Sequence, residues 1–265
     1  MSDSRFNDVR RFSSIDSTNR YLLDEARAGA PEGVVAVADH QTAGRGRLGR
    51  SWEAPPGANL LMSVLLRPDL PANERHLVTA AVALAACDAI ESLPRELALA
   101  GLVKIKWPND LVDRTGHKLA GVLAEADLTA TAGGPPPVVV GIGINVNWPG
   151  PNDDLPPELA STATSLRLQA AGGGEVDREM VLAGVLTELE LRVAALANPT
   201  GRQGLASDLA AQCTTIGASV RVDLPDGSFE GLATGLTPEG HLVVDVDGAP
   251  RTVVAGDVVH VRPRV

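Results

Sequence analysis

A cluster of positive charge lies between positions 44 and 50, where the chain reads GRGRLGR. Its arginines, Arg45, Arg47 and Arg50, repel one another unless an anion lies between them. A guanidinium group binds a carboxylate or a phosphate through two parallel hydrogen bonds, so an anionic ligand would turn this repulsion into attraction. The spacing therefore predicts a loop that closes on a negatively charged ligand. A solvated basic loop is the other interpretation of the same composition.

The glycines of this loop suggest a second hypothesis, because Gly44, Gly46 and Gly49 match the G-x-G-x-x-G pattern of dinucleotide-binding turns. That pattern requires a helix directly after the glycines, since the pyrophosphate binds the amides at the helix N-terminus. Pro55 and Pro56 follow instead, and proline lacks the amide donor and clashes with the preceding helical turn. The context therefore argues against a Rossmann-type site.

Three further segments carry polar side chains that could bind a ligand: DSTN at 16–19, KWPNDL at 106–111 and HKLAGVLAE at 117–125. Each also has an ordinary structural interpretation. Ser17 or Thr18 could cap a helix, the WPND residues favour a turn, and Lys118 could be an exposed strand lysine. Trp52, just after the basic loop, could belong to the core.

The hydrophobic pattern predicts the elements that must position these motifs. Helices are expected at 17–29, 77–90, 178–196 and 204–213. Strands are expected at 34–39, 59–68, 102–106, 118–126 and 138–147, with a loop at 131–137. From about position 218, short β-type runs alternate with PDG, PEG and VDG turns, which predicts a small all-β barrel. We therefore divide the chain into domains 1–214 and 215–265.

The composition of the 265 residues restricts the classes of protein. A net charge of −10 argues against a general nucleic-acid coat protein, because such binding needs a concentrated basic surface. Cys87 and Cys213 lie far apart, and the polar N-terminus lacks an apolar signal core, so a reducing cytoplasm is expected. The apolar run at 77–90 is too short to span a bilayer, and no membrane association is expected.

Taken in order, DSTN, GRGRLGR, KWPND and HKLAG, followed by GIGINVN at 141–147, resemble the motifs of biotin protein ligases, and the resemblance covers most of the chain. It implies an α+β fold: a biotin/lipoate ligase-like catalytic domain with a mixed sheet flanked by helices, and a small C-terminal SH3-like β-barrel. One departure is that His117 separates Gly116 from Lys118. Only sixteen residues precede Ser17, too few for the DNA-binding domain of some family members, so no repressor role is expected.

The resemblance also implies the activity. Such an enzyme activates biotin with ATP and Mg²⁺ to biotinyl-5′-AMP and pyrophosphate. It then transfers biotin to a lysine of a biotin carboxyl carrier protein or of the corresponding domain of a biotin-dependent carboxylase. A cytoplasmic monomer or weak homodimer that binds neither DNA nor membranes is expected.

The family motifs assign roles to individual residues of this chain. The residues implied for catalysis are Lys118, Arg47 and Asp110. Those implied for biotin binding are Ser17, Thr18, Asn19, Gln41, Arg45, Gly46, Arg47 and Lys118. Those implied for ATP or adenylate binding are Arg45, Arg47, Arg50, Trp52, Asn109, Lys118 and Asn145. Asp110 could bind Mg²⁺ or orient the acceptor lysine, and the sequence does not choose between these roles.

Two other functions fit part of the pattern. A lipoate–protein ligase would share the catalytic fold and the acyl-adenylate intermediate, although GRGRLGR with KWPND favours biotin. A ligand-binding regulator would need no catalysis, and the expected lack of a DNA-binding domain argues against it.

Overall fold

The computed structural model describes residues 4–127, 135–224, 226–254 and 256–260. Its largest element is a seven-stranded sheet with the strand order β1-β2-β3-β7-β6-β5-β4. The strands are β1 (Val9–Phe12), β2 (Val35–Ala38), β3 (Leu60–Leu66), β4 (Lys104–Lys106), β5 (Asp110–Val112), β6 (Lys118–Ala126) and β7 (Val138–Ile144). β1 and β2 pair in parallel, and the other neighbours pair antiparallel, so the predicted mixed sheet is confirmed.

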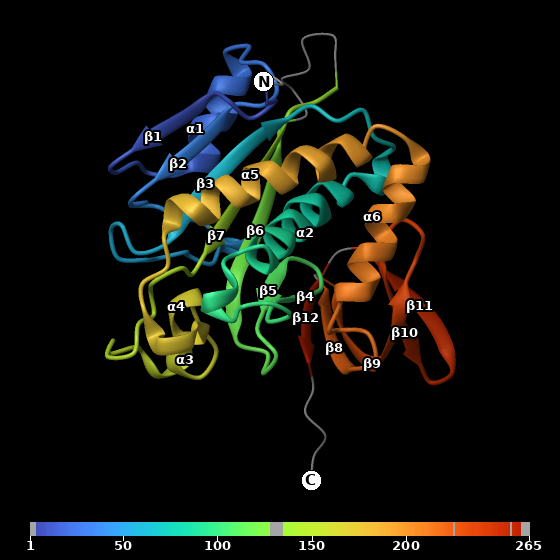
Figure 1. Ribbon diagram of the computed structural model, residues 1–265. Helices are drawn as coiled ribbons and strands as arrows, with labels where there is room; N and C mark the ends of the chain where they lie inside the picture. The colour runs from blue at the N-terminus through green and yellow to red at the C-terminus, as the bar shows by residue number, and fades with distance from the viewer. Residues whose placement is uncertain (1–3, 128–134, 225, 255, 261–265) are drawn as a thin grey trace.

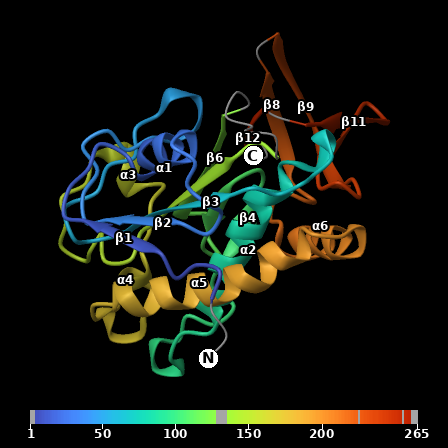
Figure 2. The ribbon, with the colours of Figure 1, turned by 90° about the horizontal axis from the view of Figure 1, so that it is seen from above.

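Helices cover the two faces of this sheet unequally, as Figures 1 and 2 show. One face packs against α2 (Leu77–Glu91), α5 (Arg178–Ala195) and α6 (Pro199–Gln212), and this contact forms the main core. The other face packs against α1 (Thr18–Arg27), where Leu22 lies in one buried cluster with the strand residues Ala36 and Leu65. Since side chains alternate along a strand, β3 and β7 contribute to both layers.

The predicted helices are present, with shifted ends. Ser17 caps α1 by accepting a hydrogen bond from the amide of Arg20, as the sequence predicts. α6 begins at Pro199, five residues before the predicted start at 204, because Asn198 caps it and proline occupies its first turn. Among the described helices, none combines the length and the apolar character needed to cross a bilayer.

Short elements were missed by the sequence analysis. β1 and β5 have 4 and 3 residues and too few apolar positions to show a period. The helices α3 (Pro157–Ala160) and α4 (Leu166–Gln169) are each a single turn. Most of the predicted loop at 131–137 lies outside the described residues.

The C-terminal part is all-β, as predicted. β8 (Ser219–Leu224), β9 (Gly227–Leu236), β10 (Leu242–Val246), β11 (Ala249–Val253) and β12 (Asp257–His260) form an antiparallel sheet in the order β11-β10-β9-β8-β12. β10 and β11 are joined by Asp247 and Gly248, both with positive φ, which is the geometry of a tight hairpin turn.

Aromatic residues from the N-terminal part hold the small sheet in place. Trp107 packs in its core and donates a hydrogen bond from the indole to the carbonyl of Gly240 at 3.2 Å. The rings of His76, just before α2, and His241 stack with their centres 4.1 Å apart. The small β-sheet therefore packs directly against the part of the chain that forms the seven-stranded sheet.

We expect this stacked contact to make stability depend on pH. Burial, and then the proximity of His241, lowers the pKa of His76 from 6.5 to about 4. The unfolded chain therefore binds a proton at a higher pH than the folded chain, so stability is lost as the pH falls from 6.5 towards 4. His76→Phe keeps a ring and removes the titration. The loss of stability between pH 7 and pH 5 should shrink by about 1–2 kcal/mol, allowing for partial solvent access.

Urea denaturation of both proteins at the two pH values measures this difference. His40→Phe, which removes a histidine away from the docking contact, serves as the control. An unchanged pH dependence in His76→Phe would contradict the interpretation.

Candidate active site

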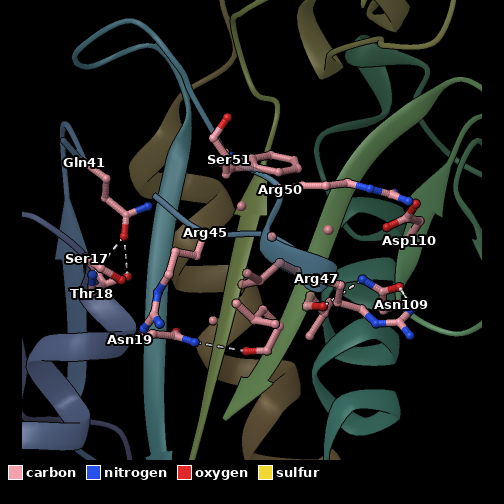
Figure 3. A pocket seen from close by; sticks show the side chains of 18 of the residues that line it. Ser17, Thr18, Asn19, Gln41, Arg45, Arg47, Arg50, Ser51, Asn109 and Asp110 are labelled. Carbon is pink, nitrogen blue, oxygen red and sulfur yellow. Dashed lines mark hydrogen bonds between the residues drawn. The ribbon is translucent and has the colours of Figure 1, made fainter. Parts of the chain in front are cut away.

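A cavity opens on the same face of the sheet as α1. It brings together all but one of the predicted site residues: Ser17, Thr18, Asn19, Gln41, Arg45, Gly46, Arg47, Arg50, Trp52, Asn109, Asp110 and Lys118 line it. Figure 3 shows hydroxyls and amides at one end, Asn109 and Asp110 at the other, and arginines between them. The motifs are far apart in sequence, so the sheet is what brings them together.

Glycines form the floor of the cavity. Gly141 and Gly143 alternate along β7 with branched residues that face the core, and Gly143 pairs with Gly121 on β6. A Cβ atom on Gly143 would lie 2.5 Å from Cε2 of Trp52, so only glycine lets the indole pack there. The sequence analysis missed these residues, although the alternation in GIGI carries the signal.

Trp52 and Lys118 meet above this floor. Nζ of Lys118 lies 5.4 Å from the centre of the Trp52 ring, within the range of a cation–π contact. Among the residues that the structure describes, the buried indole nitrogen of Trp52 has no hydrogen-bond partner. The cavity wall therefore contains a donor that a bound acceptor could satisfy.

Two cations of the cavity pair with carboxylates of neighbouring strands. Nζ of Lys118 lies 2.7 Å from Oδ1 of Asp110, across the β5–β6 pair. Nη2 of Arg45 lies 3.1 Å from Oε2 of Glu125 on β6. Glu125 was not predicted, because nothing local in the sequence links it to a loop eighty residues earlier.

The remaining two cations contact the C-terminal domain. Arg50 forms an ion pair with Asp257 at the start of β12. Arg47 donates to Oδ1 of Asn109 at 2.9 Å and to the carbonyl of Gly256 at 2.8 Å, and burial lowers the pKa of its guanidinium. The expectation that the arginines repel one another until an anion arrives is therefore wrong: the fold supplies oxygen acceptors for all three.

Hydroxyl and amide groups form the other end of the cavity. The backbone N and Oγ1 of Thr18 both donate to Oε1 of Gln41, at 2.8 and 3.0 Å. Ser17 lines the cavity while its Oγ caps α1, so the capping and ligand-binding interpretations are compatible. Asn19 donates to Glu125 at 2.8 Å and to the carbonyl of Leu123 at 3.2 Å.

Asn145 is the predicted residue that does not line this cavity. It is buried, accepts from Nδ2 of Asn59 at 3.2 Å, and donates to the carbonyls of Thr164 at 2.9 Å and Lys118 at 3.4 Å. In this arrangement Asn145 supports the strand that carries Lys118, and its contact with adenosine stays a prediction.

Comparisons with known proteins identify the family of this chain. Residues 11–145 match the Biotin/lipoate A/B protein ligase family, and residues 215–261 match the Biotin protein ligase C terminal domain. A biotin--[acetyl-CoA-carboxylase] ligase of Mycobacterium tuberculosis is 40% identical over 93% of this chain and 86% of its own length. This chain belongs to the Biotin/lipoate A/B protein ligase family. The Bifunctional ligase/repressor BirA of Bacillus spizizenii is 35% identical over 92% of this chain and 71% of its own length.

A solved structure extends this agreement to the fold. The biotin protein ligase from Aquifex aeolicus, in complex with biotin and ATP, superposes with a TM-score of 0.79. It is 26% identical in sequence, and the match covers 97% of this chain and 100% of that one. The predicted α+β architecture, with its mixed sheet and C-terminal β-domain, is confirmed.

We expect Asp257 to hold the arginine loop, residues 44–50, closed over the cavity through its ion pair with Arg50. In an Asp257→Ala variant this ion pair is lost, so the loop should open more often and trypsin should cleave after its arginines several-fold faster, since proteolysis follows local opening. Timed limited proteolysis with peptide mapping measures this rate.

Glu230→Ala is the matched control, because Glu230 is an exposed carboxylate on β9 of the same sheet and does not line the cavity. Equal cleavage rates in the two variants would show that Asp257 does not restrain the loop.

Proposed function

We propose that this protein activates biotin with ATP, forming biotinyl-5′-AMP and pyrophosphate, and then transfers biotin to a lysine of a biotin carboxyl carrier protein. One observation carries the proposal: a single cavity joins a group of neutral hydrogen-bonding side chains to a cluster of four cations. The first group suits a polar, uncharged ring, and the second suits the meeting of a carboxylate with a triphosphate.

The neutral end of the cavity is suited to the ureido ring of biotin, which offers one carbonyl acceptor and two N–H donors. Ser17, Thr18, Asn19 and Gln41 present hydroxyl and amide groups there, and Leu123 contributes an apolar wall. A pocket of this kind selects a polar ligand by the hydrogen bonds that it forms, and not by the buried apolar area alone. We assign biotin binding to these residues, with the backbone at Gly46 beside them.

The cationic end is suited to the first chemical step. An oxygen of the biotin carboxylate attacks the α-phosphorus of ATP, a bond to that phosphorus forms, and pyrophosphate leaves. We assign this step to Lys118 and Arg47, whose positive charge offsets the repulsion between the two anions and stabilises the charge developing on the phosphoryl oxygens. Arg45 and Arg50 then contact phosphate and keep the loop closed.

We assign the binding of the adenosine group of ATP to Trp52 and Asn109, together with Asn145. An indole face stacks on an adenine ring, and the unpaired donor of Trp52 supports a ligand in contact with this side chain. Asn109 already donates to the carbonyl of Val122 at 2.9 Å, so its side chain is held in one orientation beside the cavity.

Magnesium fits the oxygen donors at the same end. A magnesium ion is held in proteins by one or two carboxylates together with substrate phosphates, and Asp110 offers a carboxylate there. When bound, the ion neutralises phosphate charge. Asp110 holds Lys118 in the present structure, and its carboxylate is released when Lys118 turns to the bound anions.

The second step uses a nucleophile from the carrier. The ε-amine of the carrier lysine must lose a proton before it attacks the acyl carbon of biotinyl-5′-AMP, forming an amide while AMP leaves. We assign the orientation of that amine to Asp110 once it has separated from Lys118. A closed arginine loop meanwhile excludes water from the reactive acyl adenylate.

The same family includes lipoate ligases, and the neutral end of the cavity separates the two substrates. A dithiolane ring has no hydrogen-bond donor, so it would leave the oxygen atoms of Thr18, Asn19 and Gln41 without ligand partners. Biotin is therefore the favoured substrate.

We further propose the setting in which the enzyme works. Residues 1–214 form the catalytic domain, and residues 215–265 form a C-terminal domain that adds Asp257 to the cavity. The enzyme acts in the cytoplasm as a monomer or weak homodimer and does not bind DNA, which the net charge of −10 supports. Its partner is the carrier protein or carrier domain of a biotin-dependent carboxylase.

Pyrophosphate exchange tests the proposed activity. We expect the purified protein with ATP, Mg²⁺ and biotin to incorporate labelled pyrophosphate into ATP, because adenylation is reversible, and to show no exchange with lipoate. Folded protein that gives no biotin-dependent exchange would rule out the proposal.

A Lys118→Ala variant should lose adenylation by about 100-fold or more, the usual effect of removing one charge-stabilising donor. Lys104→Ala is the control, since Lys104 binds Gln212 outside the cavity. Normal exchange in folded Lys118→Ala would exclude the role assigned to Lys118.

A further inference from the structure

Ser63 lies beneath the neutral end of the cavity without lining it. It is on β3, opposite Gly141 on β7, and is fully buried. Its Oγ lies 2.7 Å from Oγ1 of Thr18 and 2.6 Å from Oδ1 of Asn19. Both neighbours line the cavity, so Ser63 acts on the ligand site only through them.

The side-chain oxygen atoms of Gln41, Thr18, Ser63 and Asn19 form a row in which each lies within hydrogen-bond distance of the next. The hydroxyl protons in this row are fewer than the acceptors. Thr18 uses its hydroxyl proton on Oε1 of Gln41, at 3.0 Å. The single proton of Ser63 can then be donated either to Thr18 or to Asn19, but not to both. One acceptor in the row is therefore left for a donor that comes from the ligand.

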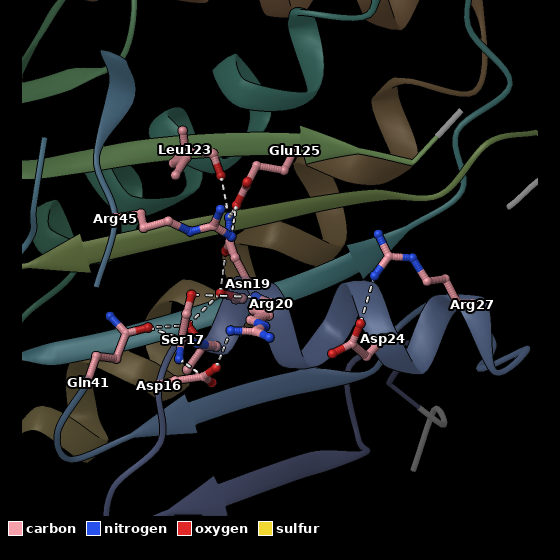
Figure 4. A network of polar contacts seen from close by, with 12 residues as sticks. Asp16, Ser17, Asn19, Arg20, Asp24, Arg27, Gln41, Arg45, Leu123 and Glu125 are labelled. Carbon is pink, nitrogen blue, oxygen red and sulfur yellow. Dashed lines mark hydrogen bonds and ion pairs between the residues drawn. The ribbon is translucent and has the colours of Figure 1, made fainter. Parts of the chain in front are cut away.

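Glu125 prevents Asn19 from reversing this polarity. A carboxylate can only accept, and Oε2 of Glu125 receives Nδ2 of Asn19 at 2.8 Å. The amide nitrogen therefore points to β6 and the amide oxygen points to Ser63. Figure 4 shows Asn19 between the Ser17–Gln41 group and the Glu125–Arg45 pair.

Gly141 makes room for this arrangement. A Cβ atom at this position would lie 2.2 Å from Oδ1 of Asn19 and 3.1 Å from Oγ of Ser63. A side chain at position 141 would therefore displace these oxygen atoms, so the row of oxygen atoms requires glycine there.

We propose that Ser63 is a positioning residue that determines ligand specificity: by holding Thr18 and Asn19 as an acceptor-rich pair, it selects a ring that offers an N–H donor to this pair. This inference rests on the proposed function, because biotin is the substrate whose ureido group supplies such a donor. Glu125 completes the arrangement by fixing the orientation of Asn19.

The test compares biotin with two cyclic carbamate analogues, in each of which an oxygen atom replaces one ureido N–H group. Biotin-dependent pyrophosphate exchange gives KM and kcat for each ligand. In Ser63→Ala we expect the KM for biotin to rise about tenfold, the effect of one hydrogen bond, with kcat within about twofold. The wild-type preference for biotin over the more strongly discriminated analogue should shrink by about tenfold, since Thr18 and Asn19 are no longer held together as a pair of acceptors.

Val64→Ala is the matched control. Val64 is the next residue of β3, is fully buried, and points to the opposite face of the sheet. The Val64→Ala variant should lose at least as much folding stability as the Ser63→Ala variant, while it keeps the wild-type KM and ligand preference. Ser63→Cys, which keeps the volume and a weak donor, should fall between Ser63→Ala and the wild type, and it serves if the alanine variant does not fold.

The outcomes separate the two proposals. Wild-type exchange that depends on biotin supports the function irrespective of Ser63. Wild-type KM and an unchanged ligand preference in the Ser63 variants would overturn this inference alone. A rise in KM for biotin and both analogues by the same factor would also overturn it, because that result indicates a structural role without selection.

Discussion

The arrangement of the site depends on balancing four positive charges around one cavity in a chain whose net charge is −10. Asp110, Glu125 and Asp257 come from β5, β6 and β12, and each pairs with one cation. Such pairs are weak when exposed, so an anionic substrate can replace the protein carboxylates as partners of the same cations. The cluster is thereby stable without a ligand and still able to bind one.

The sheet separates stability from chemistry by using its two faces differently. On β7, branched residues pack against the helices, while Gly141 and Gly143 face the cavity. The missing Cβ atoms let Trp52 and Asn19 approach the backbone closely, which places polar groups deep in the sheet. A buried polar group is tolerated only when it is hydrogen-bonded, so these side chains are held in defined orientations before a ligand arrives.

The C-terminal domain contributes to the site as well as to the fold. A sheet of this size has too little core to be stable alone, and Trp107 supplies part of that core from the catalytic domain. The same docking brings the carbonyl of Gly256 to Arg47 and Asp257 to Arg50. If the C-terminal domain left this position, Arg47 and Arg50 would lose these partners. The charge balance of the cavity, which lies mainly on the seven-stranded sheet, would then change.

The ordered motifs, through their resemblance to biotin protein ligases, predicted the class of the fold and most of the site residues. Local patterns predicted the longer helices and strands, because capping residues and apolar periods act over a few neighbouring positions. Ser17 as a helix cap and GRGRLGR as a loop over the cavity needed nothing more. Only the tertiary structure decided that Glu125 and Asp257 neutralise that loop, that Ser63 lies under Thr18, and that Asn145 is turned away from the cavity. These contacts join residues far apart along the chain, and strand pairing and domain docking, which no local pattern encodes, set which of them meet.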